Sequence, residues 1–124
     1  MAVDRIRRLC FALVLVVSLV VLFTPDSAVP VGPAGTDKVV HVALFAALTY
    51  TGVLAGLAWG PATVAMLGYA AVSEVVQALP DLGRSASVAD WAADAVGVAV
   101  GLAAVFALRR TRRWWAPPAR AVGR

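Results

Sequence analysis

Long runs of residues without a charge are the feature that most constrains this chain. The run over residues 9–24 is uncharged and rich in Val and Leu, and the run over 39–59 is interrupted only by His41. A helix needs about 20 mostly apolar residues to cross the hydrocarbon core of a bilayer. Two further, mostly apolar runs complete the pattern: 62–79, which carries Glu74 near its end, and 90 or 91 to 108, which carries Asp94 near its start. We therefore predict an all-α fold, an integral membrane bundle of four transmembrane helices.

The composition agrees with a membrane protein. Of the 124 residues, 61% are hydrophobic and 15% are charged. Soluble domains contain about 45–50% apolar and about 25% charged residues. A soluble chain of this size would have too little polar surface to cover so much apolar area. We expect a multi-pass protein of the plasma membrane with lipids as its main partners.

Arginine clusters at both ends of the chain predict its orientation. Because cytoplasmic segments carry an excess of Lys and Arg, both termini are expected in the cytoplasm, which requires an even number of spans. The loops over 26–37 and 80–86 then face outward, and a turn at Gly60 and Pro61 faces inward. A competing interpretation treats residues 1 to about 28 as a cleaved signal peptide. The clustered arginines are Arg5, Arg7 and Arg8 at the front and Arg109, Arg110, Arg112 and Arg113 near the end.

The same charge pattern indicates the domain boundaries and the classes of partner. Residues 1–110 are predicted to form the membrane domain and residues 111–124 a basic, disordered cytoplasmic tail. Basic clusters that flank apolar runs differ from the basic face of a nucleic-acid-binding domain, so no nucleic-acid partner is expected. The single cysteine, Cys10, has no disulfide partner in the chain, and we expect neither a metal nor another cofactor.

Polar residues gather at the outer ends of the predicted spans. They fall within about two helical turns of one membrane face, or about 10 Å in depth at 1.5 Å per residue. Within the helices they share faces, as Lys38 and His41 do at a spacing of three residues. The sequence therefore predicts one polar pocket, enclosed by three helices and a loop and open to the outside. Its expected residues are Asp37, Lys38, His41, Glu74, Gln77, Arg84, Ser87, Asp90 and Asp94.

The cost of burying charge favours an inward orientation of these residues. A carboxylate in the middle of a span costs roughly 2.5–3.5 kcal/mol, and less near the interface. Arg84 is the best available partner, because one guanidinium can bridge two carboxylates. Ser87 is expected to cap the fourth helix, with Asp90 at the spacing of a capping box.

Regularly spaced glycines predict close contacts between helices. Gly52, Gly56 and Gly60 repeat every four residues, and so do Gly97 and Gly101. Small residues let helix backbones approach closely in a membrane. Such faces also allow the chain to form oligomers.

Three stretches resemble the VanZ-like family of small bacterial membrane proteins. They are "DKVVH" at residues 37–41, "SEVVQALP" at 73–80 and "GRSASVADWAADAVG" at 83–97, and the resemblance covers residues 10 to 108. Asp94 departs from the family pattern, which commonly has Asn there. The resemblance implies a cell-envelope role, and the founding member is associated with resistance to the glycopeptide teicoplanin. The matching positions are Asp37, Lys38, His41, Glu74, Gln77, Arg84, Asp90 and Gly97.

Three functions fit the predicted pocket. Lys38, Arg84 and His41 suit an anionic headgroup, such as that of a lipid or a lipid-linked cell-wall precursor. His41 with nearby carboxylates also suits an enzyme that acts on a lipid-linked envelope substrate, although no Gly-x-Ser-x-Gly or His-Glu-x-x-His motif is present. Alternatively, the polar residues only hold the helices together. A charge-free inner half of the bundle makes transport the least favoured function.

Overall fold

A computed structural model describes residues 1–28, 32–82 and 85–114. Within them the chain forms four long helices, so the all-α prediction is confirmed. These helices are α1 (Ala2–Phe23), α2 (Thr36–Leu54), α3 (Trp59–Gln77) and α4 (Val88–Trp114). Two short 3-10 helices, η1 (Asp26–Ala28) and η2 (Pro80–Leu82), follow α1 and α3.

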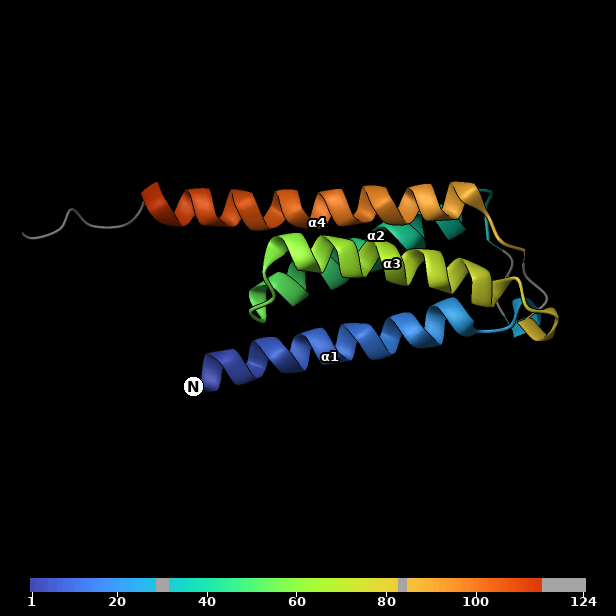
Figure 1. Ribbon diagram of the computed structural model, residues 1–124, viewed down its shortest axis with the longest axis horizontal. Coiled ribbons are helices and arrows are strands. Elements are labelled where there is room, and N and C mark those ends of the chain that lie inside the picture. Colours follow the sequence, from blue (N-terminus) through green and yellow to red (C-terminus); the bar gives the residue numbers. More distant parts are fainter. Residues whose placement is uncertain (29–31, 83–84, 115–124) are drawn as a thin grey trace, which may run out of the picture.

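The four helices run up and down beside one another (Figure 1). The N-terminus, the turn between α2 and α3 and the last turns of α4 lie at one end of the bundle, and η1 and η2 lie at the other (Figure 1). The most extensive contact joins α2 to α4, while α1 packs against α2 and α3.

The turn between α2 and α3 differs from the prediction. We expected a turn at Gly60 and Pro61, but α2 ends at Leu54 and α3 already begins at Trp59. The chain reverses at Gly56, whose φ of +113° favours glycine. Pro61 is accommodated in the first turn of α3, because the backbone N–H groups there have no partner within the helix.

Other helix boundaries also extend beyond the predicted spans. α1 begins at Ala2, before the arginines, and α4 begins at Val88 and continues to Trp114. Residues 111–114, which we assigned to the cytoplasmic tail, are therefore helical. Residues 115–124 of that tail lie outside the described residues.

The core is apolar and lies along the bundle axis. One cluster centres on Phe45 and Leu48 of α2, and a smaller one joins Val53 of α2 to Val105 of α4. Large apolar side chains also cover the outer surface, as at Leu13 and Val64. An apolar exterior around an apolar core is what a helix bundle in lipid requires.

Gly97 and Gly101 set the distance between α2 and α4. A Cβ atom at Gly97 would lie 2.5 Å from the Val42 carbonyl oxygen, and one at Gly101 would lie 2.6 Å from that of Ala46. These two glycines make the predicted close contact. The expectation was wrong for Gly56, which lies in a turn, and for Gly60, where an added Cβ would meet nothing within 4 Å.

Among the described residues, three helices are long and apolar enough to cross a membrane. They are Ala2–Phe23, Thr36–Leu54 and the part of α4 over Val88–Thr111. Helix α3 has the same length as α2, 19 residues, but begins with Trp59, Gly60 and Pro61 and carries Glu74 and Gln77 near its end. The chain is thus a multi-span helical membrane protein, and the role of α3 as a fourth span remains a prediction.

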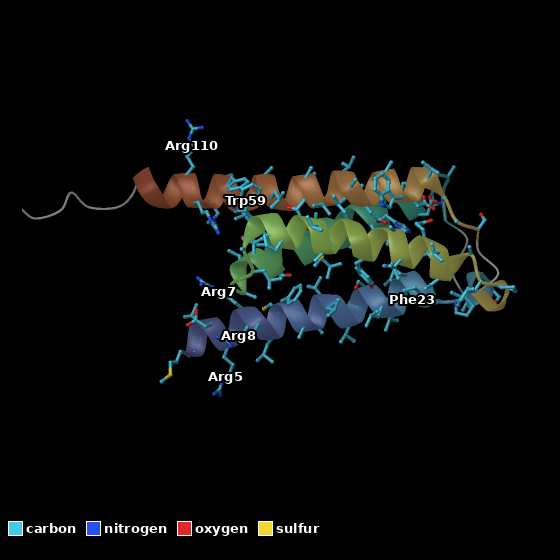
Figure 2. All side chains as sticks on the ribbon, in the orientation of Figure 1. Arg5, Arg7, Arg8, Phe23, Trp59 and Arg110 are labelled. Carbon is cyan, nitrogen blue, oxygen red and sulfur yellow. The ribbon has the colours of Figure 1, made fainter. Side chains whose placement is uncertain are left out.

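The two ends of the bundle differ in chemistry. Arg5, Arg7 and Arg8 of α1 and Arg110 of α4 lie towards the end that carries Trp59, while Phe23 lies towards the other (Figure 2). Trp59 packs edge-on against Phe106 of α4, with ring centroids 6.1 Å apart. This end, which we call the arginine end, lies opposite the polar residues described next.

Candidate functional site

Polar side chains from three helices meet at the end opposite the arginines. His41 of α2, Glu74 of α3 and Asp90 of α4 each place one metal-ligating atom within 4.8 Å of the others. His41 and Glu74 are buried and Asp90 is half-buried. We refer to these residues, together with Asp37, Lys38, Ser87 and Asp94, as the polar cluster.

The deepest contact in the polar cluster joins α2 to α4. His41 Nδ1 lies 2.7 Å from Asp94 Oδ1, and the two side chains are 2% and 0% exposed. When Asp94 is ionised it can only accept hydrogen bonds, and His41 Nδ1 is then the donor. The ring is thereby held in place with Nε2 left to accept a proton or bind a ligand.

Glu74 connects α3 to the start of α4. The Ser87 backbone N–H donates to Glu74 Oε2 at 2.7 Å, and the Ser87 hydroxyl accepts from the Asp90 N–H at 3.2 Å. The predicted N-cap at Ser87 is confirmed. In a capping box, the residue at the position of Asp90 would bind the N–H of the capping residue. Here Glu74, from a different helix, makes that contact.

Lys38 lies at the rim of the polar cluster. Its Nζ is 3.0 Å from Asp37 Oδ2 and 3.2 Å from Asp90 Oδ1. The Lys38 and Asp37 side chains are almost half exposed. Exposed ion pairs contribute little to stability, because water screens them and long side chains lose freedom. Lys38 can therefore leave Asp37 at low cost.

Two expected residues do not join these contacts. Gln77 lies on α3 one turn from Glu74, but its Nε2 donates to the Leu22 backbone oxygen at 2.9 Å. It thus caps the end of α1, where carbonyl groups lack partners within the helix. Arg84, which we predicted to be the best partner for the carboxylates, lies outside the described residues.

A second link between α1 and α3 escaped the sequence-based prediction. The Ser18 hydroxyl lies 3.1 Å from the Tyr69 hydroxyl, and Ser18 is fully buried. Both residues stand in apolar runs and carry no charge, so the sequence gives no signal that they meet. Together with the contact of Gln77, this one joins α1 to α3.

Some buried oxygen atoms of the polar cluster have no hydrogen-bond partner. Among the described residues, these are Glu74 Oε1 and Asp94 Oδ2. Buried polar atoms in proteins are paired in the large majority of cases, because an unpaired one costs free energy. Thr49 Oγ1, outside the polar cluster, is also without a partner among the described residues, and Arg84, the predicted partner of the carboxylates, lies outside them.

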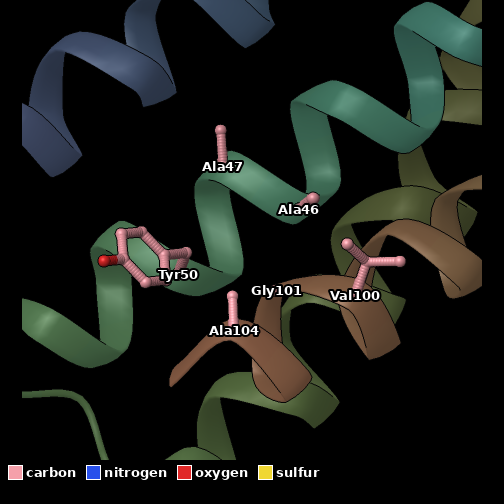
Figure 3. A pocket seen from close by; sticks show the side chains of 6 residues that line it. All are labelled: Ala46, Ala47, Tyr50, Val100, Gly101 and Ala104. Atoms are coloured by element: carbon pink, nitrogen blue, oxygen red, sulfur yellow. The ribbon is translucent and has the colours of Figure 1, made fainter. Parts of the chain in front are cut away.

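An apolar groove lies elsewhere, between α2 and α4 (Figure 3). Its volume is about 330 Å³. None of the residues that line it belongs to the polar cluster, and the predicted pocket open to the outside stays a prediction. The lining residues are Ala46, Ala47, Tyr50, Val100, Gly101 and Ala104.

Comparisons with known proteins give no match: no family model, no curated protein and no solved structure is similar to this chain. The assignment therefore comes from the chain itself. It is a small multi-span helical membrane protein with a buried cluster of His, Glu and Asp side chains.

Proposed function

We propose that this chain is a binding protein of the bacterial plasma membrane that recognises an anionic headgroup. The ligand is a lipid or a lipid-linked precursor of the cell envelope. One observation carries this proposal: polar side chains contributed by three helices, with the half-exposed Lys38 at their rim, occupy one end of an otherwise apolar bundle. The ends of membrane-spanning helices lie at the depth of lipid headgroups.

The orientation forms part of this proposal. We infer that α3 spans the membrane like the other three helices and that both termini are cytoplasmic. The arginines at one end support this, because Lys and Arg collect on the cytoplasmic side. The polar cluster at the other end then faces the extracytoplasmic side, where envelope precursors are used.

Lys38 and Arg84 supply the positive charge that an anionic headgroup needs. Lys38 is exposed at the rim, and its ion pair with Asp37 is of the weak, solvent-screened kind, whereas Asp90 is only 14% exposed. A phosphate oxygen can replace Asp37 as the partner of Lys38. Arg84 is included from the sequence, because guanidinium groups bind phosphate with two parallel hydrogen bonds.

The experiment is a lipid-binding assay on the purified full-length chain in detergent. Phosphatidylglycerol and a polyprenyl pyrophosphate represent the two sources of the headgroup, and phosphatidylcholine is the neutral reference. We expect Lys38→Ala and Arg84→Ala each to weaken binding of one anionic lipid at least tenfold.

Arg110→Ala is the matched control, since Arg110 is exposed at the arginine end. It is expected to leave the affinity unchanged. Equal affinities of the wild type, Lys38→Ala and Arg84→Ala for both anionic lipids would refute the proposal. A preference for one anionic lipid identifies the source.

The contact between His41 and Asp94 favours a second candidate, an enzyme that acts on a lipid-linked envelope substrate. A histidine held at Nδ1 by a carboxylate, with Nε2 free, is the arrangement of many general bases. The test is release of phosphate from a polyprenyl pyrophosphate. Release that is abolished in His41→Ala but not in Arg110→Ala would establish this function. Absence of turnover in folded, lipid-binding protein would exclude it for this substrate.

The resemblance to the VanZ-like family extends the proposal to teicoplanin. If the chain shares that role, its expression in a sensitive bacterium raises teicoplanin resistance, and Lys38→Ala removes the effect. Unchanged resistance with normal amounts of membrane-inserted protein would separate this chain from that role.

A further inference from the structure

We propose that His41, Glu74 and Asp90 bind one divalent transition-metal ion, and that Zn²⁺ fits them best. Each of three helices contributes one ligand, and the three ligating atoms lie within 4.8 Å of one another. In a tetrahedral zinc site with bonds of about 2.0–2.2 Å, ligand atoms lie about 3.4 Å apart. Rotations of the Glu74 and Asp90 side chains would close the difference.

The surroundings of His41 resemble those of a metal ligand. A histidine that binds a metal through one ring nitrogen almost always donates its other N–H to a carboxylate, a carbonyl or water. His41 Nδ1 makes this contact with Asp94 at 2.7 Å, which leaves Nε2 for the ion. Asp94 thus fixes the ring, a positioning role that does not require it to touch the metal.

Glu74 provides an independent observation. Its side chain is 5% exposed, and Oε2 accepts the hydrogen bond from the Ser87 N–H. Oε1 is buried and, within the described part of the chain, has no hydrogen-bond partner. A carboxylate that is anchored by one oxygen and unpaired at the other is ready to bind a cation.

The types of donor atom select the ion. The set contains one imidazole nitrogen and two carboxylate groups. Ca²⁺ and Mg²⁺ prefer sites built of oxygen alone, whereas imidazole suits zinc and other transition metals. Three protein ligands leave a fourth position open on Zn²⁺. A phosphate oxygen can occupy that position.

The ion would also offset the excess of negative charge in the polar cluster. The described cluster contains four carboxylates, from Asp37, Glu74, Asp90 and Asp94, and one lysine. A bound cation would make this end attractive to an anionic headgroup. Lys38, whose Nζ is 3.2 Å from Asp90 Oδ1, lies close enough to bind the same headgroup. This role of the ion rests on the function proposed above, whereas its binding does not.

The test measures Zn²⁺ binding to the full-length chain in detergent, freed of metal by a chelator, without added lipid. Isothermal titration is expected to give one Zn²⁺ per chain. Thermal unfolding is expected to show a higher melting temperature with Zn²⁺, because a ligand that binds only the folded state stabilises it. Glu74→Gln is the decisive variant. It removes the charge but keeps an oxygen that can accept from the Ser87 N–H. We expect it and Asp90→Asn to weaken binding at least tenfold.

Asp4→Asn is the matched control, because Asp4 is an exposed carboxylate of α1 at the arginine end. It is expected to bind Zn²⁺ like the wild type. Folded wild-type chain that binds no Zn²⁺ at micromolar concentration would refute the site. Equal affinities in the wild type, Glu74→Gln and Asp90→Asn would refute it as well.

The role of the ion is tested separately, by repeating the assay for phosphatidylglycerol and polyprenyl pyrophosphate with and without Zn²⁺. Tighter lipid binding with Zn²⁺ supports the role. Lipid binding that does not change when Zn²⁺ is removed refutes this role of the ion but not the metal site. Zn²⁺ binding without any lipid binding refutes the proposed function and leaves the metal site standing.

Discussion

His41 Nδ1 and Asp94 Oδ1 lie 2.7 Å apart between α2 and α4, in side chains that are almost completely buried. No other contact of the polar cluster is as deep among the described residues. Two helices that are distant in sequence are thereby held in one register. The bond needs an acceptor at residue 94, and an amide oxygen serves as well as a carboxylate oxygen.

We predict that Asp94→Ala destabilises the protein by about 1–3 kcal/mol, because it leaves the buried Nδ1–H of His41 without an acceptor. Asp94→Asn is expected to cost much less, because its amide oxygen still accepts from His41. Unfolding by denaturant in micelles measures both values. Equal losses for the two variants would mean that the charge of Asp94, rather than its hydrogen bond, is essential.

A methyl group at Gly97 should force α2 and α4 apart. Its Cβ would lie 2.5 Å from the Val42 carbonyl oxygen, a distance that requires the backbones to move. We expect Gly97→Ala to destabilise the protein by about 1–3 kcal/mol, as for other overpacked sites. Thermal unfolding in micelles provides the measurement.

Gly68→Ala is the control for this prediction. Gly68 is exposed on α3, and an added Cβ would meet nothing within 4 Å. Replacing a glycine inside a helix by alanine is expected to stabilise by about 0.5–1 kcal/mol. The interpretation of Gly97 fails if the two variants behave alike.

Gln77→Leu should loosen the end of α1. The substitution preserves much of the side-chain volume but removes the donor that binds the Leu22 carbonyl at 2.9 Å. The expected cost is about 1 kcal/mol, and the amides in the last turn of α1 should exchange hydrogen faster. Val75→Leu is the control, because Val75 faces outward on the same helix. Unchanged exchange in Gln77→Leu would contradict the capping role.

The proposed orientation predicts which positions a membrane-impermeant thiol reagent reaches in intact cells. In a Cys10→Ser background, Ser85→Cys should be labelled, because residue 85 is exposed at the end of the polar cluster. Ala58→Cys, exposed in the turn between α2 and α3, should be labelled only after the membrane is permeabilised. The reverse pattern would invert the orientation.

The sequence predicted the helices well because hydrophobic runs determine which segments are buried in lipid. It misplaced the turn between α2 and α3, since Gly60 and Pro61 look like a turn but also fit the first turn of a helix. Gly56, whose positive φ lets the chain reverse, was instead expected to make a close contact between helices.

Local contacts of the polar cluster were easier to predict than long-range ones. The Ser87 cap depends on residues three apart, and it was recognised from that spacing. The bond from Ser87 to Glu74 and that from Gln77 to Leu22 depend on how deeply α3 sits beside its neighbours. Sequence spacing within one helix contains no information about that depth.

The opposite chemistry of the two bundle ends gives the molecule a large electric dipole along its axis. The arginines of α1 and those in the last turns of α4 belong to one end, and the carboxylates of the polar cluster to the other. In an energised bacterium the cytoplasm is electrically negative, and moving one elementary charge across 100 mV is worth about 2.3 kcal/mol. With the arginines inside, the membrane potential would itself hold the bundle in the proposed orientation, most strongly in actively respiring cells.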